Sequence, residues 1–185
     1  MPDTRQAEWG KAVSAYLKSV QAQQSESAKS QRFLLLLKEL FGVQPDFIED
    51  YVAGIERYVK VKQKDRILRG RIDNLFGNLV IEFERDLSKT RRDAEEQLKR
   101  YIAVLWSQEG PGRRVPYLCM ATDGTRFAVY TPTLQEGSEL DISPEDVRLE
   151  PLEVVDLSSL TPQEVYFWLD RYLLRREVLS PKTEN

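Results

Sequence analysis

The sequence contains no histidine among its 185 residues. This absence excludes Ser-His-Asp triads, Cys-His dyads and zinc hydrolases that use histidine ligands. Any catalysis must therefore depend on carboxylates, lysines, arginines, tyrosines or a bound metal. Hard divalent cations such as Mg²⁺ prefer oxygen ligands, so the remaining possibilities favour carboxylate chemistry.

Cysteine and long apolar segments are also scarce. Cys119 is the single cysteine, so neither an intrachain disulfide nor a cysteine-rich zinc site can form. The longest strongly apolar run, residues 33–37, is far too short to span a bilayer, and residues 1–25 contain no apolar signal core. We therefore expect no membrane association and a reducing cytoplasmic location.

The length and composition (41% hydrophobic, 31% charged) are typical of one globular domain. We expect a single domain over residues 1–185, with N-terminal helices in 1–44, a core in 45–131, and an acidic loop with a C-terminal helix in 132–185. The sequence contains no internal repeat and no low-complexity linker.

Helical patterns occur in five segments, residues 5–24, 25–42, 45–59, 90–106 and a last segment that starts at Thr161. Gly42 stands where a C-terminal cap belongs. Thr161, Pro162 and Glu164 form a capping-box pattern, with proline at the first helical position.

Strand patterns occur in residues 58–64, 66–76 and 79–84, and in a hairpin over 115–133 whose turn lies at Asp123-Gly124. The acidic residues 135–150 are expected to form a loop with short turns. Helices and strands in this order predict a mixed α/β (α+β) domain, with a central mixed β-sheet flanked by helices.

The hairpin around Gly77-Asn78 places acids among apolar residues. A two-residue turn pairs Phe76 with Leu79 and therefore Asp73 with Glu82, and it sets Arg71 opposite Glu84. Two carboxylates directly opposite one another destabilise a sheet unless a proton or a cation lies between them. A divalent metal is one solution, because two carboxylates and a strand carbonyl supply oxygen ligands. The alternative is a solvent-facing strand side whose acids pair with Arg69, Arg71 and Arg85.

Positive charge is concentrated immediately before this hairpin. Residues 57–71 hold seven cations and one acid, whereas residues 135–156 hold eight acids and one cation. The basic segment is either a solvated strand and turn or a surface that contacts nucleic-acid phosphates.

The pattern of Asp73 with Ile81-Glu82-Phe83-Glu84 resembles the core motif of the PD-(D/E)xK nuclease superfamily. Gln97 and Tyr101 match the Gln-x-x-x-Tyr element of its RecB-like members, and they lie one helical turn apart. The ordered set over residues 50–131 resembles the restriction nuclease domains at the N-terminus of type IIG enzymes and their relatives in type I subunits.

This resemblance implies a restriction-endonuclease-like fold with its catalytic core in 45–131 and a Mg²⁺- or Mn²⁺-dependent DNA endonuclease activity. Asp73, Glu82 and the backbone carbonyl of Phe83 would hold the metal. An acid on the preceding helix often completes such sites, and Glu56 is the first candidate here, followed by Glu49 and Glu39. Gln97 and Tyr101 would hold a DNA phosphate or brace the catalytic strand. Further phosphate contacts would come from the basic segment, through Lys60, Lys62, Lys64, Arg69 and Arg71.

Glu84 departs from the family pattern, which has a lysine at this position. A second glutamate can act as a metal ligand or general base, or the change can mark a nuclease fold that has lost catalysis and only binds nucleic acid or partner proteins. The expected partners are DNA, a methyltransferase or specificity domain or subunit that reads sequence, and a second copy of the chain, because double-strand cleavage needs two active sites.

Overall fold

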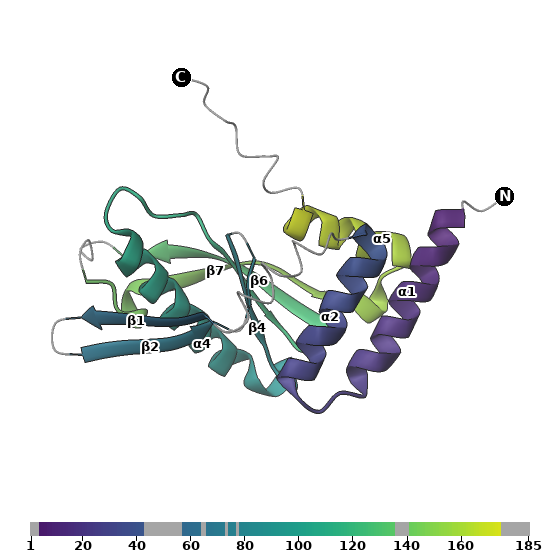
Figure 1. The fold of residues 1–185 in the computed structure, drawn as a ribbon, viewed down its shortest axis with the longest axis horizontal. Helices are drawn as coiled ribbons and strands as arrows, with labels where there is room; N and C mark the ends of the chain where they lie inside the picture. Colours follow the sequence, from purple (N-terminus) through teal and green to yellow (C-terminus); the bar gives the residue numbers. More distant parts are fainter. Residues whose placement is uncertain are drawn as a thin grey trace, which may run out of the picture.

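The computed structural model describes residues 4–42, 57–63, 66–72, 74–76, 78–135 and 141–174. Its longer helices and its strands are, in chain order (Figure 1), α1 (Thr4–Gln21), α2 (Glu26–Phe41), β1 (Arg57–Gln63), β2 (Arg66–Ile72), β3 (Asn74–Phe76), β4 (Leu79–Phe83), α4 (Leu87–Glu109), β5 (Leu118–Thr122), β6 (Arg126–Leu134), β7 (Val147–Asp156) and α5 (Pro162–Leu169). Short helical turns precede β7, follow it and extend α5, at Pro144–Asp146, Leu157–Ser159 and Asp170–Leu174.

Five strands form the main sheet in the order β3-β4-β5-β6-β7. β4 and β5 are parallel and are connected through α4, whereas the other neighbouring strands are antiparallel. β1 and β2 pair with each other in a separate antiparallel ribbon. This arrangement confirms the predicted mixed α/β class with a central mixed sheet.

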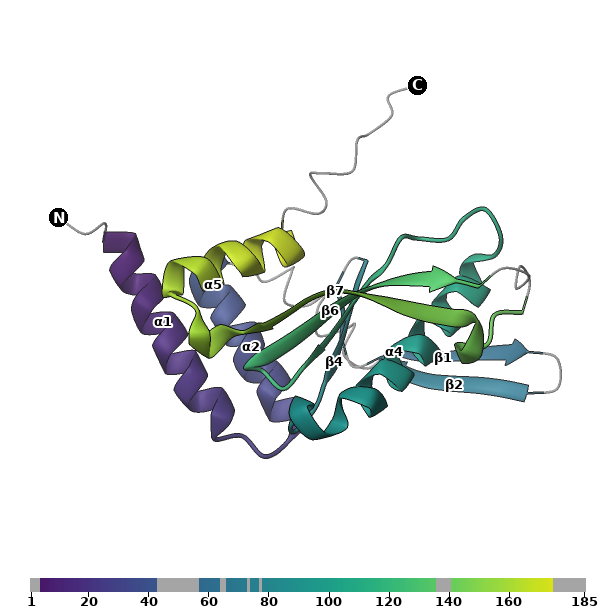
Figure 2. The same ribbon diagram turned by 180° about the vertical axis from the view of Figure 1, so that it is seen from behind.

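The two faces of the main sheet are covered by different helices, as Figures 1 and 2 show from opposite sides. Leu79, Ile81 and Phe83 of β4 belong to the apolar cluster formed with α1, α2 and α5. Val80 belongs to the second cluster, which is formed mainly with α4. This alternation follows from the two-residue period of a strand, and it assigns each β4 residue to one face.

The predicted helix ends are confirmed at several residues. Gly42 adopts a φ of 60° after α2, and its N–H donates to the carbonyl of Lys38. Thr161 and Glu164 form the capping box of α5, with Pro162 at the first helical position. Among the described residues, no helix combines the length and the apolar character needed to cross a membrane.

Two sequence predictions of secondary structure were wrong. The helix predicted over 45–59 fails at its end, because residues 57–59 belong to β1, where valines alternate with cations; the rest lies outside the described residues. The predicted loop over 135–150 fails from Val147, where the ten-residue strand β7 begins. β7 is an edge strand, and such strands tolerate acids and proline, which made this segment resemble a loop.

The loop between β5 and β6 packs tightly against α1. Gly124 has a φ of +89°, in the left-handed region that favours glycine. The hydroxyl of Tyr16 donates to the Gly124 carbonyl over 2.5 Å, and a Cβ at Gly124 would collide with the Val20 side chain. The close approach of α1 to this loop therefore requires glycine.

Replacement of Gly124 by alanine tests this close approach. Gly112→Ala is the matched control, because Gly112 also has a positive φ of 77° but has open space around it. We expect Gly112→Ala to lower the free energy of unfolding by about 1–2 kcal/mol through backbone strain alone. Gly124→Ala should cost about 1–3 kcal/mol more through the clash, as measured by chemical denaturation. Val20→Ala should recover part of that difference in the double variant, and equal effects of the two glycine substitutions would contradict the packing argument.

Candidate functional site

Glu82 lies in the middle of β4, an otherwise apolar strand, and is only 7% exposed. Its neighbour in the parallel register is Ala121 of β5, which belongs to the apolar cluster under α4. The alternation along β4 assigns Glu82 to the same face as Val80, so it lies on the α4 side of the sheet. Burial of a carboxylate at such a position is costly unless hydrogen bonds or a cation compensate it.

The predicted register of the β3–β4 hairpin is confirmed. Phe76 pairs with Leu79, and Leu75 and Asn74 pair with the next two residues of β4. Asp73, predicted to face Glu82, lies outside the described residues, and so do Glu49, Glu56 and Lys64.

The predicted opposition of Arg71 and Glu84 stays a prediction. Arg71 belongs to β2, where the ladder with β1 pairs it with Tyr58. Glu84 follows the end of β4, and its N–H donates over 2.8 Å to the Thr122 carbonyl at the end of β5. The predicted strand over 66–76 is divided between two sheets, because β1 pairs with its first part and β4 with its last.

The backbone of β4 directs the carbonyl of Phe83 away from β5. The Asn78 carbonyl accepts from the N–H of Leu118, and Glu84 donates to Thr122, so the even-numbered residues face β5. Backbone groups alternate along a strand, so the carbonyl of Phe83 is directed toward the β3 side. This direction of the Phe83 carbonyl is compatible with its predicted role as a metal ligand beside Glu82.

α4 carries Gln97 and Tyr101 on the flank nearer to β4. Arg91 and Glu95 on the other flank reach Tyr130 of β6. Gln97 follows Glu95 by two positions, a rotation of about 200° around the helix. The sheet order places β4 on the opposite side of β5 from β6, and α4 also packs against β4, β1 and β2. Gln97 is half-buried and Tyr101 is buried in the cluster between α4 and the sheet, and their predicted action together with Glu82 stays a prediction.

The other flank of α4 forms a polar network that the sequence did not indicate. Arg91 Nε donates to Glu95 Oε1 over 3.2 Å and to the Tyr130 hydroxyl over 2.9 Å. Tyr130 donates in turn to Glu95 Oε1 over 2.6 Å. These side chains line a groove of about 320 Å³ between α4, β6 and β7. Burial, followed by the hydrogen bond to Glu95, raises the pKa of Tyr130 to about 12.

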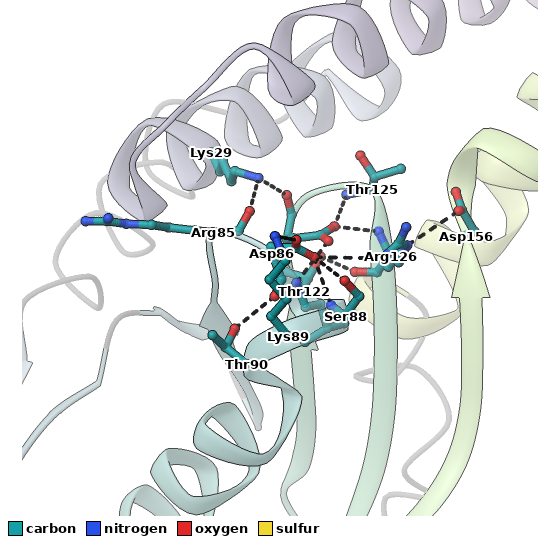
Figure 3. Close-up of polar contacts among 12 residues, drawn as sticks. Lys29, Arg85, Asp86, Ser88, Lys89, Thr90, Thr122, Thr125, Arg126 and Asp156 are labelled. Atoms are coloured by element: carbon teal, nitrogen blue, oxygen red, sulfur yellow. Dashed lines mark hydrogen bonds and ion pairs between the residues drawn. The ribbon is translucent and has the colours of Figure 1, made fainter.

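A buried lysine joins the carboxyl ends of the two parallel strands (Figure 3). Lys29 of α2 is 6% exposed, and its Nζ donates to the carbonyl of Arg85 over 2.8 Å and to that of Asp123 over 2.9 Å. The sequence motifs did not predict a role for this residue. A signal was present, because Lys29 shares the helical stripe of Phe33, Leu36 and Leu40, where a charged residue is unusual.

The side chain of Asp123 adds further hydrogen bonds at the same junction. One carboxylate oxygen accepts from the N–H groups of Thr125 and Arg126, and the other accepts from the N–H of Leu87 at the start of α4. Asp86 caps the same helix, and hydrogen bonds from Ser88 and Lys89 lower its pKa to about 2. The end of β4, the β5–β6 loop and the start of α4 are therefore fixed relative to one another.

The described residues around Glu82 offer oxygen atoms as metal ligands, which is the type of ligand that suits a hard cation. Glu82 and Glu84 offer carboxylate oxygens and Phe83 offers a carbonyl, which are the ligands that Mg²⁺ and Mn²⁺ prefer. No group of three or more His, Cys, Asp or Glu residues within the described ranges could hold a metal on its own. Glu39, the described alternative helix acid, lines grooves among α1, α2 and α5 in which no β4 residue takes part.

The predicted phosphate-binding residues fall on one ribbon. Lys60 and Lys62 lie in β1, and Arg69 and Arg71 lie in β2. Both strands pack against α4, the helix that carries Gln97 and Tyr101.

Comparison of the chain with protein-family models, with curated proteins and with solved structures finds no match. The resemblance to PD-(D/E)xK nucleases therefore stays a prediction based on the residues.

Lys29→Met tests the junction at the strand ends. Loss of the ammonium removes the donor from two backbone carbonyls, so we expect the free energy of unfolding to fall by about 1–3 kcal/mol in chemical denaturation. Lys38→Met on the exposed side of the same helix is the control and should change stability by less than about 0.5 kcal/mol. Equal stability of the two variants would show that the Lys29 contacts contribute nothing.

Tyr130 should ionise near pH 12 rather than near its ordinary pKa of about 10. The stability that neutral Tyr130 contributes is fully present below pH 10 and decreases as the pH rises toward 12, because only the unfolded state ionises readily in that range. The difference in ultraviolet absorbance between wild type and Tyr130→Phe, followed during an alkaline titration, reports the ionisation of the Tyr130 hydroxyl alone. Glu95→Gln should lower the pKa of Tyr130, and a difference signal that titrates near pH 10 in the wild type would contradict the network.

Proposed function

We propose that this protein is a metal-dependent DNA endonuclease of restriction type, which hydrolyses phosphodiester bonds with a metal-activated water. The observation that carries the proposal is the buried carboxylate of Glu82 on the face of β4 that α4 covers, the helix to which Gln97 and Tyr101 belong. These are three of the residues that the sequence motif predicts to act together.

The surrounding framework supports an active site on β4. Lys29 and Asp123 fix the end of β4 against β5 and the start of α4. Figure 3 shows Lys29 beside Arg85 at this junction. A carboxylate that must hold a metal needs such a fixed backbone, because ligand positions have to be maintained to a fraction of an ångström. Glu82 stands three residues before Arg85, whose carbonyl Lys29 binds.

The oxygen donors support magnesium or manganese as the cofactor. Glu82 and the carbonyl of Phe83 would hold the ion together with Asp73, and Glu56 is the proposed further ligand. A metal bound there supplies Lewis-acid activation of water and of the scissile phosphate. Gln97 and Tyr101 would orient the phosphate from α4, and the cations of β1 and β2 would bind the flanking phosphates.

The identity of Glu84 supports a second hypothesis, in which the protein is a binding module and not an enzyme. Glu84 stands where the resembling family has lysine, and a nuclease fold without that cation could bind nucleic acid or a partner protein without cutting. In the catalytic hypothesis, half-buried Glu84 acts as a further ligand or as the general base. Sequence recognition by another domain or subunit, and pairing with a second copy for double-strand cleavage, belong to the same proposal.

The Glu82→Gln variant distinguishes the catalytic from the non-catalytic hypothesis. Two measurements are used, the rate of plasmid cleavage and the melting temperature. We expect wild-type protein to nick plasmid DNA with Mg²⁺ or Mn²⁺, and Glu82→Gln to lose at least about 100-fold of that rate. Mn²⁺ should raise the melting temperature of the wild type but not of Glu82→Gln, because the variant lacks a metal ligand.

Glu96→Gln is the matched control, since Glu96 is an exposed acid of α4 paired with Lys99. It should retain both cleavage and the Mn²⁺ shift. If the wild type shows neither metal-dependent nicking nor a Mn²⁺ shift, the catalytic proposal is wrong. Cleavage that appears only in Glu84→Lys would identify the natural chain as the inactive form.

A further inference from the structure

β7 is the last strand of the main sheet, so among the described residues only β6 pairs with it. The start of the β6–β7 ladder shows which of its backbone groups face the outer edge. The N–H of Gln135 donates to the carbonyl of Asp146 over 2.9 Å. In an antiparallel pair, residues whose groups bond to the neighbouring strand alternate with residues whose groups point away from it. Counted from Asp146, the groups of Val147, Leu149 and Pro151 therefore point to the outer edge.

Two prolines agree with this assignment. Pro132 of β6 is the register partner of Leu149, and Pro151 of β7 is the register partner of Tyr130. Proline has no N–H and fits a ladder where no bond to the neighbouring strand is needed. Both prolines stand in pairs of this kind, so the ladder with β6 makes no use of the backbone groups of Leu149.

Beside residues 147–151 the outer edge offers mainly acceptors. The carbonyls of Val147, Leu149 and Pro151 and the N–H of Leu149 are directed outward, whereas the N–H of Val147 donates to the carbonyl of Pro144. Within the described ranges, no hydrogen bond occupies the Leu149 N–H or these outward carbonyls. An antiparallel strand opposite Leu149 would exchange two hydrogen bonds with that residue and donate one to each of the other two carbonyls.

A groove lies beside this part of β7, on the side of α4. Its volume is about 320 Å³, and Val147, Leu149 and Pro151 line it together with Arg91 and Glu95 of α4. A strand added to the edge of β7 would direct every second side chain to this side of the sheet. In binding by strand addition, main-chain hydrogen bonds provide affinity, and pockets for alternate side chains provide specificity. The edge and the groove together meet both requirements.

A second copy of β7 is a poor occupant of this edge. Two copies paired about Leu149 would exchange only the two hydrogen bonds between the Leu149 residues. Pro151 has no N–H and the N–H of Val147 is already used, so neither can donate to the carbonyl that it would face in the partner. A strand with all its N–H groups available satisfies every outward carbonyl, so the edge favours a different chain.

The charge around this edge indicates the chemistry of that chain. Residues 141–156 contain six acids and one cation, Arg148. The Glu150 side chain is 47% exposed, and Leu152 and Val154 are 55% and 59% exposed, so solvent reaches this part of the strand. Complementary charge across an interface steers association and selects the partner. A segment that carries lysine or arginine fits an acidic edge of this kind.

We propose that the outer edge of β7 binds a basic, extended segment of a partner protein, which joins the main sheet as a further strand beside Leu149. One of its side chains enters the groove between α4 and β7. The candidate site on β4 lies elsewhere in the sheet order, with β5 and β6 between β4 and β7. The inference therefore does not depend on the nuclease proposal.

A displayed library of random peptides of about ten residues is the probe for this edge. We expect the full-length protein to select peptides enriched in lysine and arginine. Methylation of every second backbone nitrogen of a selected peptide should abolish binding in one of the two alternating sets and preserve it in the other, because a strand uses alternate N–H groups. Selection of no sequence, or of sequences without basic residues, would overturn the proposal.

Two substitutions at Leu149 isolate the backbone donor. Leu149→Ala removes the same packing as Leu149→Pro but keeps the outward N–H, so a selected peptide should bind Leu149→Pro at least about fivefold more weakly than Leu149→Ala. Glu150→Lys should also weaken binding, whereas Glu96→Lys, on an exposed part of α4, should not. Equal affinities of the two Leu149 variants would contradict the strand addition. Thermal melting establishes that each variant is folded.

Hydrogen exchange followed by nuclear magnetic resonance tests the same contact in the unaltered chain. The amide of Leu149 should exchange rapidly in the free protein and slowly with a selected peptide, whereas the amide of Glu150, which bonds to β6, should exchange slowly in both. A Leu149 amide that stays unprotected in the complex would overturn the proposal. Glu82→Gln should bind the peptide as the wild type does, so failure of the nuclease proposal leaves this result unaffected.

Discussion

Lys29 places a buried positive charge between the carbonyls of Arg85 and Asp123, at the carboxyl ends of two parallel strands. Three layers of the molecule meet at this ammonium: α2 supplies it, β4 and β5 end at it, and Asp123 links the same point to the start of α4. A parallel strand pair has no hairpin turn to hold its register, so contacts at the strand ends fix it instead. The register that sets Glu82 of β4 beside Ala121 of β5 therefore depends on the contacts at this junction.

Most of the fold could be predicted because its signals are local. The capping residues around Gly42 and Thr161, and the turn residues Asn78 and Asp123-Gly124, mark element ends within a few positions of the sequence. β7 could not be predicted in this way. Its acids and Pro151 suit an edge strand as well as a loop, and only pairing with β6 decides between them.

The candidate site was predictable where it depends on one hairpin and one helix. The β3–β4 register and the Gln97–Tyr101 spacing follow from strand and helix periods alone. The pairing of β1 with β2 could not be predicted in this way, because local patterns do not reveal which strands become neighbours. Lys29 was missed for a related reason. Its acceptors lie far away in the sequence, and a backbone carbonyl has no residue type by which a pattern can identify it.

Recognition of backbone rather than side chains has a consequence for how this protein can vary. Lys29 and Tyr16 bind the carbonyls of Arg85, Asp123 and Gly124, groups that every residue type provides. Arg85 is exposed, so drift at that position leaves the contact with Lys29 intact. The constraint falls instead on Lys29, whose side chain cannot change without releasing the end of β4. The β5–β6 loop is constrained in another way, because Gly124 needs its positive φ and Asp123 uses its own carboxylate.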